Sequence, residues 1–423
     1  MTTTGKTYGY SFFCVILWLL LFQPNHTYAY GYDSTRTRQL IINGGYVVQD
    51  GSGLNKYREQ DLFIPASTLK ILTCLVALEE LGKDYRFETH FFLDEHNNLY
   101  IKGYGDPFLT SETLLEVGQK LIEHGVKEIG TVFLDESTFA LDGELASPEN
   151  SANPYDVPNG ALAVNFNALP VHITKSDTTP AITTVTSGEP QTPLLPMMTE
   201  AAASLLPGRH HINVATLPQS GRLSPALRYT GELFIAQFQQ AGISIKKGYA
   251  KKLVPAGLKP VYIHHSSKSL EEISRACLKY SNNYIANQLF LACGIKFFGL
   301  PATWEKSRRA FTLFAEKKLE LSPKQIYVQE GSGLSRQNRM SPDALLAILD
   351  SFKPYNALLN QKSSILVKSG TMKDVYCYAG YFSRGNRLIP YAILLNQPQN
   401  NRDKVLHILH AAILEQQLPR VNQ

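Results

Sequence analysis

The chain lacks several features that would indicate a metal-binding or nucleic-acid-binding protein. It contains 5 cysteines among 423 residues, and none of them shows C-x-x-C or zinc-ligand spacing, so no metal or cofactor is predicted. Its formal net charge of +5 is spread along the chain without a basic block that has aromatic residues interleaved, which argues against a nucleic-acid partner. No internal repeat is present. The composition is 44% hydrophobic and 18% charged, in a chain long enough for a large core and more than one domain.

After the N-terminal segment, the sequence also lacks any stretch that is long and apolar enough to span a membrane. Lys6 gives that end a positive charge, residues 12–22 are apolar but too few to span a bilayer comfortably, and residues 27–29 form a weak small-x-small cleavage site. We therefore predict a signal peptide over residues 1–29, with an uncleaved membrane anchor as the alternative. The mature chain is expected to be exported, periplasmic or extracytoplasmic, and soluble, without a stable membrane anchor.

Removal of this segment leaves four cysteines, an even number that permits disulfides in an exported protein. One lies in an apolar helical stretch, and two others would be too far apart for a bridge on one continuous helix. The preferred interpretation is that all four are buried free thiols: Cys74, Cys277, Cys293 and Cys377.

The chain is organised around the stretch from Pro65 to Gly82. A proline at the start and a glycine at the end are typical of helix termini, and the residues between them are apolar nearly all round, which predicts a helix buried in a core. Ser67 and Lys70 lie three residues apart in the first turn, on one face. Burying a lysine is costly unless its proton is lost or its charge is matched, and a serine beside it then has a base within reach. We therefore predict that Ser67 is a nucleophile and Lys70 its base.

The pattern of hydrophobic residues and turn signals predicts a chain of mixed helices and strands. The expected strands span residues 39–42, 45–48, 87–93, 99–101, 129–134, 160–167, 170–174, 243–246, 260–267, 366–368, 378–383 and 388–396. The expected helices span residues 65–82, 111–124, 229–242, 269–293 with an interruption at 280–283, 303–316, 342–352 and 401–417. This order predicts an α+β fold in which an antiparallel sheet is covered by helices, with residues 85–254 as inserted α+β material.

Two further motifs follow Ser67-x-x-Lys70. Residues 281–283 (Ser-Asn-Asn) form an S-x-N element in an apolar helical region, and residues 368–371 (Lys-Ser-Gly-Thr) form a K-[ST]-G element on an expected strand. Each short motif is weak alone, and a second S-x-x-K copy occurs at residues 244–247. Together, in this order, S-x-x-K, S-D-N and K-T-G are the signature of penicillin-interacting serine enzymes.

The chain resembles the penicillin-binding protein 4 family, which comprises D-alanyl-D-alanine carboxypeptidases and endopeptidases with extra domains inserted after the first motif. The resemblance covers nearly the whole mature chain and includes blocks at residues 65–70, 81–89, 103–107, 331–336 and 379–381. It departs from the pattern in the middle motif, which reads Ser-Asn-Asn rather than Ser-Asp-Asn, at Ser369, where Thr is usual, and at Glu330, where Asp is expected.

The resemblance implies a penicillin-binding/β-lactamase-like transpeptidase domain formed by residues 30–84 and 255–423. Residues 85–254 would form the inserted accessory domain or domains.

The resemblance also implies a mechanism. Ser67 would attack the D-Ala-D-Ala carbonyl and form an acyl-enzyme, and Lys70 would take its proton while neutral. Ser281 would relay a proton to the leaving amine, and Asn283 would bind the acyl-side amide and hold Lys70. The backbone N–H groups of Ser67 and Thr371 would form the oxyanion hole.

Further residues are expected to bind the substrate. Lys368 would stay charged and supply positive potential for the terminal carboxylate, with the hydroxyls of Ser369 and Thr371 bonding it and Gly370 between them. Asp156 stands roughly where the family has an acid that faces the substrate's side-chain amine, although a solvated surface carboxylate is the alternative.

The expected function is a penicillin-sensitive serine D-Ala-D-Ala carboxypeptidase or endopeptidase that acts on peptidoglycan stem peptides. β-Lactam antibiotics are its expected covalent inhibitors. The alternatives are a catalytically weak or inactive penicillin-binding wall protein, a β-lactamase and a non-enzymatic structural protein. No motif residue is lost, however, and no convincing Glu-x-x-Leu-Asn element supplies a deacylating glutamate. The sequence leaves open the balance of carboxypeptidase, endopeptidase and transpeptidase activity.

Overall fold

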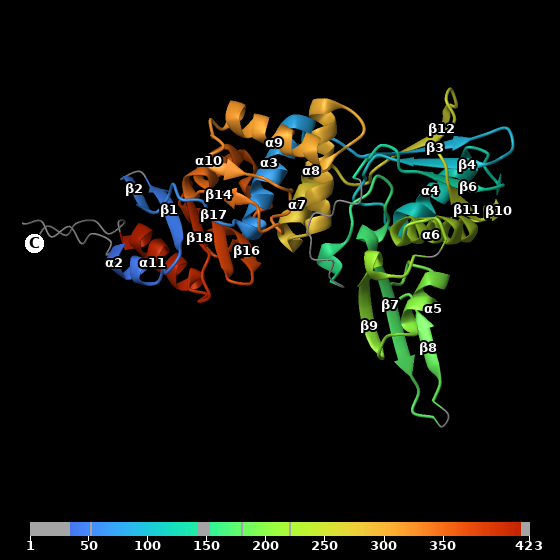
Figure 1. The fold of residues 1–423 in the computed structure, drawn as a ribbon, viewed down its shortest axis with the longest axis horizontal. Coiled ribbons are helices and arrows are strands. Elements are labelled where there is room, and N and C mark those ends of the chain that lie inside the picture. The colour runs from blue at the N-terminus through green and yellow to red at the C-terminus, as the bar shows by residue number, and fades with distance from the viewer. Residues whose placement is uncertain (1–33, 51–52, 142–152, 179–180, 220, 416–423) are drawn as a thin grey trace, which may run out of the picture.

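The computed structural model describes residues 34–50, 53–141, 153–178, 181–219 and 221–415. The predicted signal peptide, residues 1–29, lies outside them. Figure 1 shows two layered parts side by side, with a narrow arm extending from one of them. Across the described ranges, no helix combines the length and the apolar character needed to cross a bilayer.

The first part is built on a six-stranded antiparallel sheet with the strand order β15-β16-β17-β18-β1-β2. The first strand, β1, pairs with the last strand, β18, and Gly44 lies opposite Leu395. The sheet therefore combines strands from both ends of the described chain. The strands are β1 (Gly44–Asp50), β2 (Gly53–Tyr57), β15 (Asn360–Lys362), β16 (Ile365–Met372), β17 (Val375–Arg384) and β18 (Arg387–Leu395).

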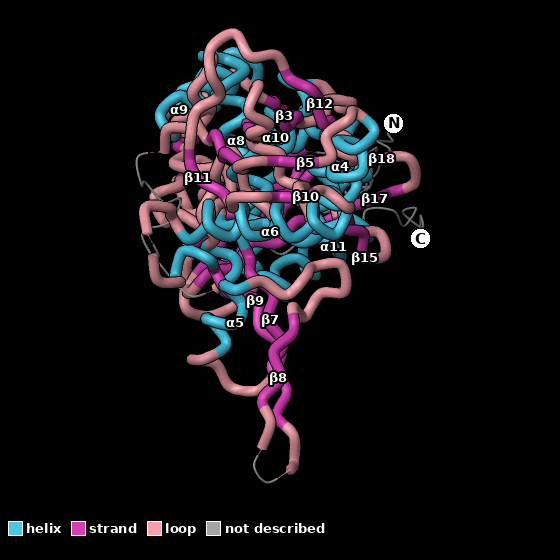
Figure 2. The backbone as a smooth tube through the Cα atoms, turned by 90° about the vertical axis from the view of Figure 1, so that its right-hand side faces the viewer, coloured by secondary structure: helices cyan, strands magenta, loops and turns pink. Residues whose placement is uncertain are grey.

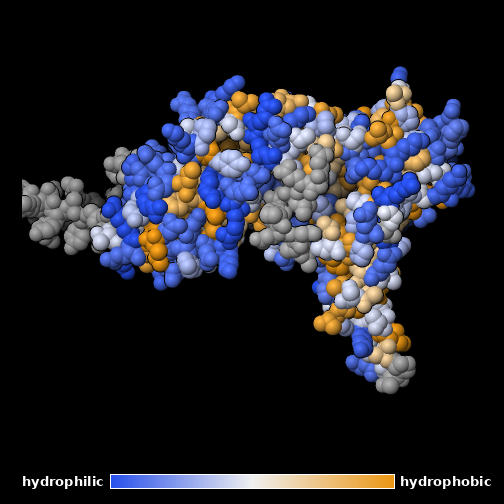
Figure 3. All heavy atoms as spheres, viewed as in Figure 1, coloured by the Kyte–Doolittle hydropathy of each residue, from blue (hydrophilic) through white to orange (hydrophobic). Residues whose placement is uncertain are grey.

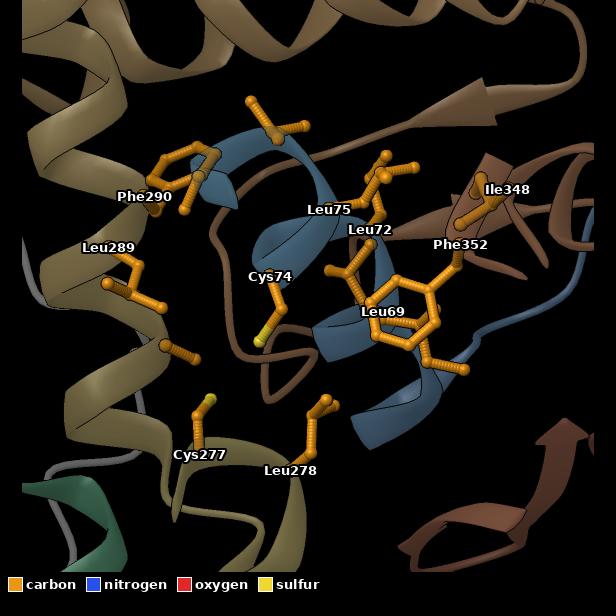
Figure 4. Close-up of a cluster of buried hydrophobic side chains, with 14 of the residues drawn as sticks. Leu69, Leu72, Cys74, Leu75, Cys277, Leu278, Leu289, Phe290, Ile348 and Phe352 are labelled. Carbon is orange, nitrogen blue, oxygen red and sulfur yellow. The ribbon is translucent and has the colours of Figure 1, made fainter. Parts of the chain in front are cut away.

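Helices cover both faces of this sheet, which confirms the predicted α+β arrangement. On one face, α10 (Pro342–Phe352) lies against the sheet, and α3 (Lys70–Leu81) packs between α10 and α8 (Asn283–Phe298). On the other face lie α11 (Arg402–Glu415) and α2 (Ser34–Gln39). Figure 4 shows side chains of α3 directed toward α8 on one side and α10 on the other, with α7 (Leu270–Tyr280) below them. This explains why α3 is apolar nearly all round.

The start of the central helix differs in detail from the prediction. Residues Ala66–Leu69 form a 3₁₀ turn, η1, and the α-helix begins at Lys70. Gly82 ends the helix with φ of 89°, a conformation that glycine adopts without steric cost. The proposed nucleophile therefore lies in a tight turn and the proposed base at the head of a buried helix.

The second part has a core of its own around a five-stranded mixed sheet with the order β11-β6-β4-β3-β12, covered by α4 and α6. These elements are β3 (Glu88–Leu93), β4 (Leu99–Gly103), β6 (Val132–Asp135), β11 (Tyr249–Lys251), β12 (Pro260–His265), α4 (Ser111–Glu123) and α6 (Pro225–Ala241). β12 follows residue 254 yet pairs with β3, so this sheet draws strands from both predicted segments. The domain boundaries themselves stay a prediction.

The arm is a three-stranded sheet in the order β8-β7-β9, seen edge-on in Figure 2. Its elements are β7 (Ala168–Lys175), β8 (Thr183–Thr186) and β9 (Gly208–Asn213), with α5 (Pro196–Ala202) beside β7 and β8. Figure 3 shows apolar residues on the surface of the arm, and Ile182, Leu194 and Leu206 are exposed there. The remaining strands and α-helix of the described residues are β5 (Glu128–Ile129), β10 (Ser244–Ile245), β13 (Ile326–Tyr327), β14 (Arg339–Met340) and α9 (Trp304–Lys318), and the remaining 3₁₀ helices are η2 (Pro154–Asp156), η3 (Asn165–Asn167), η4 (Val214–Thr216) and η5 (Lys353–Leu358).

Two expected strands are wrong. Residues 39–42 instead hold the end of α2 and a turn, where the Gln397 side chain accepts a hydrogen bond from the Ile42 N–H at 2.8 Å. Residues 160–167 form no strand, and residues 165–167 have left-handed φ angles of 45°, 58° and 54°, which a pleated strand does not accommodate.

The preferred interpretation of the cysteines is confirmed, since all four described cysteines are buried and free. Cys277 and Cys293 lie on two helices, α7 and α8, rather than on one. Figure 4 shows the sulfur atoms of Cys74 and Cys277 directed toward each other beneath the start of α3.

Candidate active site

The first motif lies in a turn that two other segments approach closely. Ser67 is half-buried in η1, and Ala66 before it has a left-handed φ of 46°, a conformation that persists only where the surrounding structure fixes it. A Cβ atom at Gly333 would clash with the Ala66 carbonyl, and one at Gly370 would lie 3.0 Å from the Ser67 amide nitrogen. Both glycines therefore permit the close contact that fixes this turn.

Lys70 connects the first motif to the rest of the site. Its side chain is completely buried, and its Nζ donates to Ser67 Oγ at 3.0 Å, to Asn283 Oδ1 at 2.7 Å and to the Ser332 carbonyl at 2.6 Å. The amide and carbonyl oxygens can only accept hydrogen bonds, whereas a serine hydroxyl can also donate. When Lys70 loses a proton, its two remaining N–H groups therefore stay on those two oxygens, and its lone pair faces the Ser67 hydroxyl.

The second motif occupies the junction of two helices. Ser281 ends α7 with a left-handed φ of 54°, and the Asn282 side chain caps α8 by accepting a backbone N–H. Asn283 is the first residue of α8, and its Nδ2 donates to the Tyr155 carbonyl at 3.1 Å. That contact orients the amide group, so its Oδ1 is the atom that faces Lys70.

The third motif lies on β16. Lys368 is buried, and its Nζ donates to Ser281 Oγ at 2.8 Å and to the Ser369 carbonyl at 2.9 Å. The second motif therefore contacts a lysine at each end: Asn283 accepts a hydrogen bond from Lys70, and Ser281 accepts one from Lys368. The structure thus brings together the five residues for which the sequence predicts a catalytic role.

Both lysines have a lowered pKa. Burial lowers the pKa of Lys70 to about 8, opposed by nearby groups that include the Glu330 carboxylate. Burial and then the charge of Lys70 lower the pKa of Lys368 to about 7. The mechanism predicted from the sequence needs a neutral Lys70 beside a charged Lys368, and in the free protein burial favours the neutral form of both lysines. A bound carboxylate would raise the pKa of Lys368 by favouring its charged form.

Glu330, for which sequence reasoning noted only a departure from the family pattern, organises the loop that faces Lys70. It is buried, and its Oε2 accepts from the Ser332 N–H at 2.8 Å and from the Ser332 hydroxyl. Its Oε1 accepts from the Gly333 N–H at 2.8 Å, the Ser335 N–H at 3.2 Å and Asn338 Nδ2 at 2.7 Å. The carboxylate thereby fixes the loop whose Ser332 carbonyl holds Lys70.

Glu330→Gln should both destabilise the protein and impair the site. Both oxygens of the Glu330 carboxylate accept from N–H donors. In glutamine an NH₂ group replaces one of these oxygens, so the N–H groups on that side would face another donor and lose their acceptor. We expect the free energy of unfolding to fall by about 3 kcal/mol and reaction of Ser67 with a β-lactam to slow by about 10²-fold. Urea unfolding and acylation rates measure the two effects.

Two further variants make this test specific. Glu330→Asp keeps two acceptor oxygens and should retain most of the stability and rate, while Glu316→Gln, an exposed position on α9, should change neither. Near wild-type behaviour of Glu330→Gln would contradict the role assigned to the carboxylate.

The other predicted residues lie close by. Ser369 and Thr371 are exposed on one face of β16. Asp156 is half-buried beside Tyr155, whose carbonyl contacts the second motif, and its predicted contact with a substrate amine stays a prediction. Within the described ranges, no three His, Cys, Asp or Glu side chains gather to hold a metal ion.

Comparison with known proteins gives a family match. Residues 42–374 match the D-Ala-D-Ala carboxypeptidase 3 (S13) family. A D-alanyl-D-alanine carboxypeptidase from Actinomadura sp. is 27% identical over 352 residues, which are 73% of this chain and 64% of that relative, so the chain spans slightly less than two thirds of it. The D-alanyl-D-alanine carboxypeptidase DacB of Haemophilus influenzae is 24% identical over 411 residues, 82% of each chain.

At least one solved structure has a similar fold. Penicillin binding protein 4 (dacB) from Haemophilus influenzae superposes with a TM-score of 0.72 at 19% sequence identity, covering 91% of this chain and 99% of that one. At this identity the likeness shows a shared fold. The predicted resemblance and the predicted fold class are therefore confirmed.

Proposed function

The chain belongs to the D-Ala-D-Ala carboxypeptidase 3 (S13) family, and on that premise we propose that it is a penicillin-sensitive serine D-Ala-D-Ala carboxypeptidase or endopeptidase. Its substrates are peptidoglycan stem peptides, and β-lactams acylate the same serine. The observation that carries this proposal is the setting of Lys70: a buried amine with two acceptor-only oxygens and the Ser67 hydroxyl as its hydrogen-bond partners.

The reaction begins with Ser67. Neutral Lys70 takes the hydroxyl proton as Oγ forms a bond to the carbonyl carbon of the penultimate D-Ala. The negative charge that develops on the carbonyl oxygen is met by the backbone N–H groups of Ser67 and Thr371, which the close packing of Gly370 against the nucleophile turn supports.

Collapse of the tetrahedral intermediate breaks the peptide bond. The leaving amine needs a proton, and Ser281 relays to it the proton that Lys70 took from Ser67. Lys368 stays charged and donates a hydrogen bond to the Ser281 hydroxyl. Asn283 keeps Lys70 in place and binds the acyl-side amide. Water then attacks the acyl-enzyme, releases the shortened peptide and restores Ser67.

Digestion of purified peptidoglycan tests the proposal. The mature protein should release terminal D-Ala from pentapeptide stems, cleave cross-linked dimers into monomers, or do both, and mass spectrometry distinguishes these products. Ser67→Ala protein is the control and should yield none. A folded protein that leaves both bonds intact would overturn the proposal, whereas rapid hydrolysis of penicillin itself would favour a β-lactamase.

We further propose that the protein is exported, which the N-terminal pattern of residues 1–29 supports. This would give the enzyme access to the cell wall. The mature chain should begin near Tyr30 and be recovered from the soluble fraction outside the cytoplasmic membrane, as intact mass measurement of fractionated cells would report. An unprocessed chain that stays with membranes would contradict this.

A further inference from the structure

Two cysteines that the proposed mechanism does not use face each other in the core beside the first two motifs. Cys74 lies on α3 one turn after Lys70, and Cys277 lies on α7 one turn before the second motif. Both side chains are completely buried, and Figure 4 shows their sulfur atoms directed toward each other. Cys74 Sγ donates to the carbonyl of Ser274, one turn before Cys277, at 3.9 Å. The pair therefore lies between the helix that carries the base and the helix that leads to the second motif.

Cys277 also holds the turn that carries the second motif. Its carbonyl accepts from the Ser281 N–H and from the Asn282 N–H, the latter at 3.2 Å. Its thiol donates a weak hydrogen bond to the Asn282 carbonyl at 3.8 Å. A displacement of Cys277 would therefore shift Ser281 and Asn283, whose side chains contact the two buried lysines.

The surroundings of the two thiols make their acidities unequal. Burial and a hydrogen bond with Cys277 raise the pKa of Cys74 well above its usual value. Burial acts on Cys277 in the same direction, but the hydrogen bond with Cys74 and the charges of Lys70 and Lys368 lower the pKa of Cys277. The thiolate is the reactive form of cysteine in thiol–disulfide exchange. Of the two cysteines, Cys277 is therefore the one suited to attack a disulfide.

We propose that Cys74 and Cys277 form a disulfide site through which thiol oxidation controls the acylation of Ser67. The oxidant is the disulfide of a low-molecular-mass or protein thiol. The Cys277 thiolate attacks one sulfur of that disulfide, forms a mixed disulfide and expels the other sulfur as a thiolate. Cys74, as its thiolate, then attacks the Cys277 sulfur and expels the second thiolate. The two protons lost by the cysteines pass to the two released thiols, so the protein loses two electrons and the oxidant gains them.

The disulfide slows acylation because it draws together two helices that hold the site. A disulfide keeps its sulfur atoms about 2.0 Å apart, closer than two unbonded thiols can lie, so α7 shifts toward α3. The bond also removes the thiol proton that Cys277 donates to the Asn282 carbonyl. Catalytic groups must be held within about 0.5 Å of their productive geometry. This inference rests on the proposed function, because it concerns the regulation of the same serine.

The oxidant reaches the pair when α7 moves away from the core, since neither sulfur atom is exposed in the folded protein. α7 has 11 residues, and its outer face is exposed at Glu272, Arg275 and Lys279. Local opening of a short element at the surface costs less free energy than global unfolding. Exchange without a catalyst should therefore take minutes to hours. An exported enzyme, as proposed above, works in surroundings where such oxidants persist.

The test compares oxidised and reduced wild-type protein, so it does not depend on how a variant folds. Folded mature protein is incubated for several hours with oxidised glutathione or with dithiothreitol, and free thiols are then alkylated. Mass spectrometry of the unreduced digest should find a peptide that links Cys74 to Cys277 only after oxidation. Acylation by a chromogenic β-lactam should be at least about 10-fold slower in the linked protein. Addition of dithiothreitol should restore the rate.

Two variants make the test specific. Cys277→Ala has no attacking thiol, so its acylation rate should be the same after both incubations. Cys293→Ala is the matched control, because it removes an equally buried thiol from α8, and it should respond to oxidation as the wild type does. Absence of the linked peptide, or a linked protein that is acylated as fast as the reduced one, would overturn this inference and leave the proposed function standing. Reduced wild-type protein that is not acylated at all would overturn the proposed function instead.

Discussion

Ser67→Ala should abolish covalent attachment of labelled penicillin, which we expect on the wild-type protein at this residue. A β-lactam mimics the D-Ala-D-Ala bond and acylates the nucleophile, and the alanine variant has no side-chain oxygen at position 67 to accept the acyl group. Loss of a serine nucleophile typically lowers turnover by about 10⁶-fold. Gel detection of the label and peptide mapping by mass spectrometry measure both its extent and its position.

The chain contains a matched control for this experiment. Ser244 is the serine of a second S-x-x-K copy, which the structure places on the short strand β10. Ser244→Ala should label fully. Thermal unfolding of both variants should stay close to that of the wild type, because Ser67 is only half-buried and alanine fits the same turn. Equal labelling of wild type and Ser67→Ala would refute the nucleophile assignment.

The parts of the site that could be predicted from the sequence are those whose chemistry lies in side chains at fixed spacing. Ser67 and Lys70 are three residues apart on a helical start, and the apolar run after them required a buried helix, which the structure has. The other two motifs were recognisable because their order and setting matched the first. The spacing of residues within each motif therefore identified the candidate catalytic side chains.

The missed parts depend on contacts between distant segments. The Ser332 carbonyl that holds Lys70 is a backbone group, and backbone groups have no signature in a sequence. Arg402 reaches the third motif only because α11 folds back onto the sheet. Glu330 was visible as an acid before a glycine-rich loop, but its several hydrogen-bond donors became apparent only in the folded loop.

That burial lowers the pKa of Lys368 as well as that of Lys70 could not be predicted from the sequence, for a similar reason. The mechanism predicted from the sequence needs one neutral and one charged lysine, but the sequence does not show how deeply each side chain is buried. In the structure burial is the largest cause of the lowering for both, and each lies in the field of other groups. Protonation in such a pair belongs to the pair rather than to either residue alone.

Lys70→Arg should nearly eliminate acylation, with a fall of about 10³–10⁴-fold, the contribution expected of a general base. Guanidinium keeps a cation at the site but has no lone pair to receive the Ser67 proton. It must also fit a completely buried position with acceptors at 2.6 and 2.7 Å. Second-order acylation rates with a chromogenic β-lactam measure the loss.

Lys368→Arg is the matched variant, since it makes the same substitution at the other lysine. It keeps the positive charge needed for the substrate carboxylate and should retain activity, with acylation slowed about 10-fold by altered hydrogen bonding to Ser281. If Lys368→Arg proved the more damaging of the two, the roles assigned to the lysines would have to be exchanged.

The pH dependence separates the two lysines further. Lys70 must be neutral, so the acylation rate should rise with pH through the ionisation of this residue, whereas Lys368 must be charged, so the rate should fall as that residue loses its proton. With pKa values of about 8 and about 7, the wild-type profile should be a bell with its maximum between these values. Lys368→Arg cannot lose its charge, so its profile should rise with pH and then stay level. A bell that persists in Lys368→Arg would mean that another group provides the falling limb, and a rising limb that persists in Lys70→Arg would mean that Lys70 is not the base.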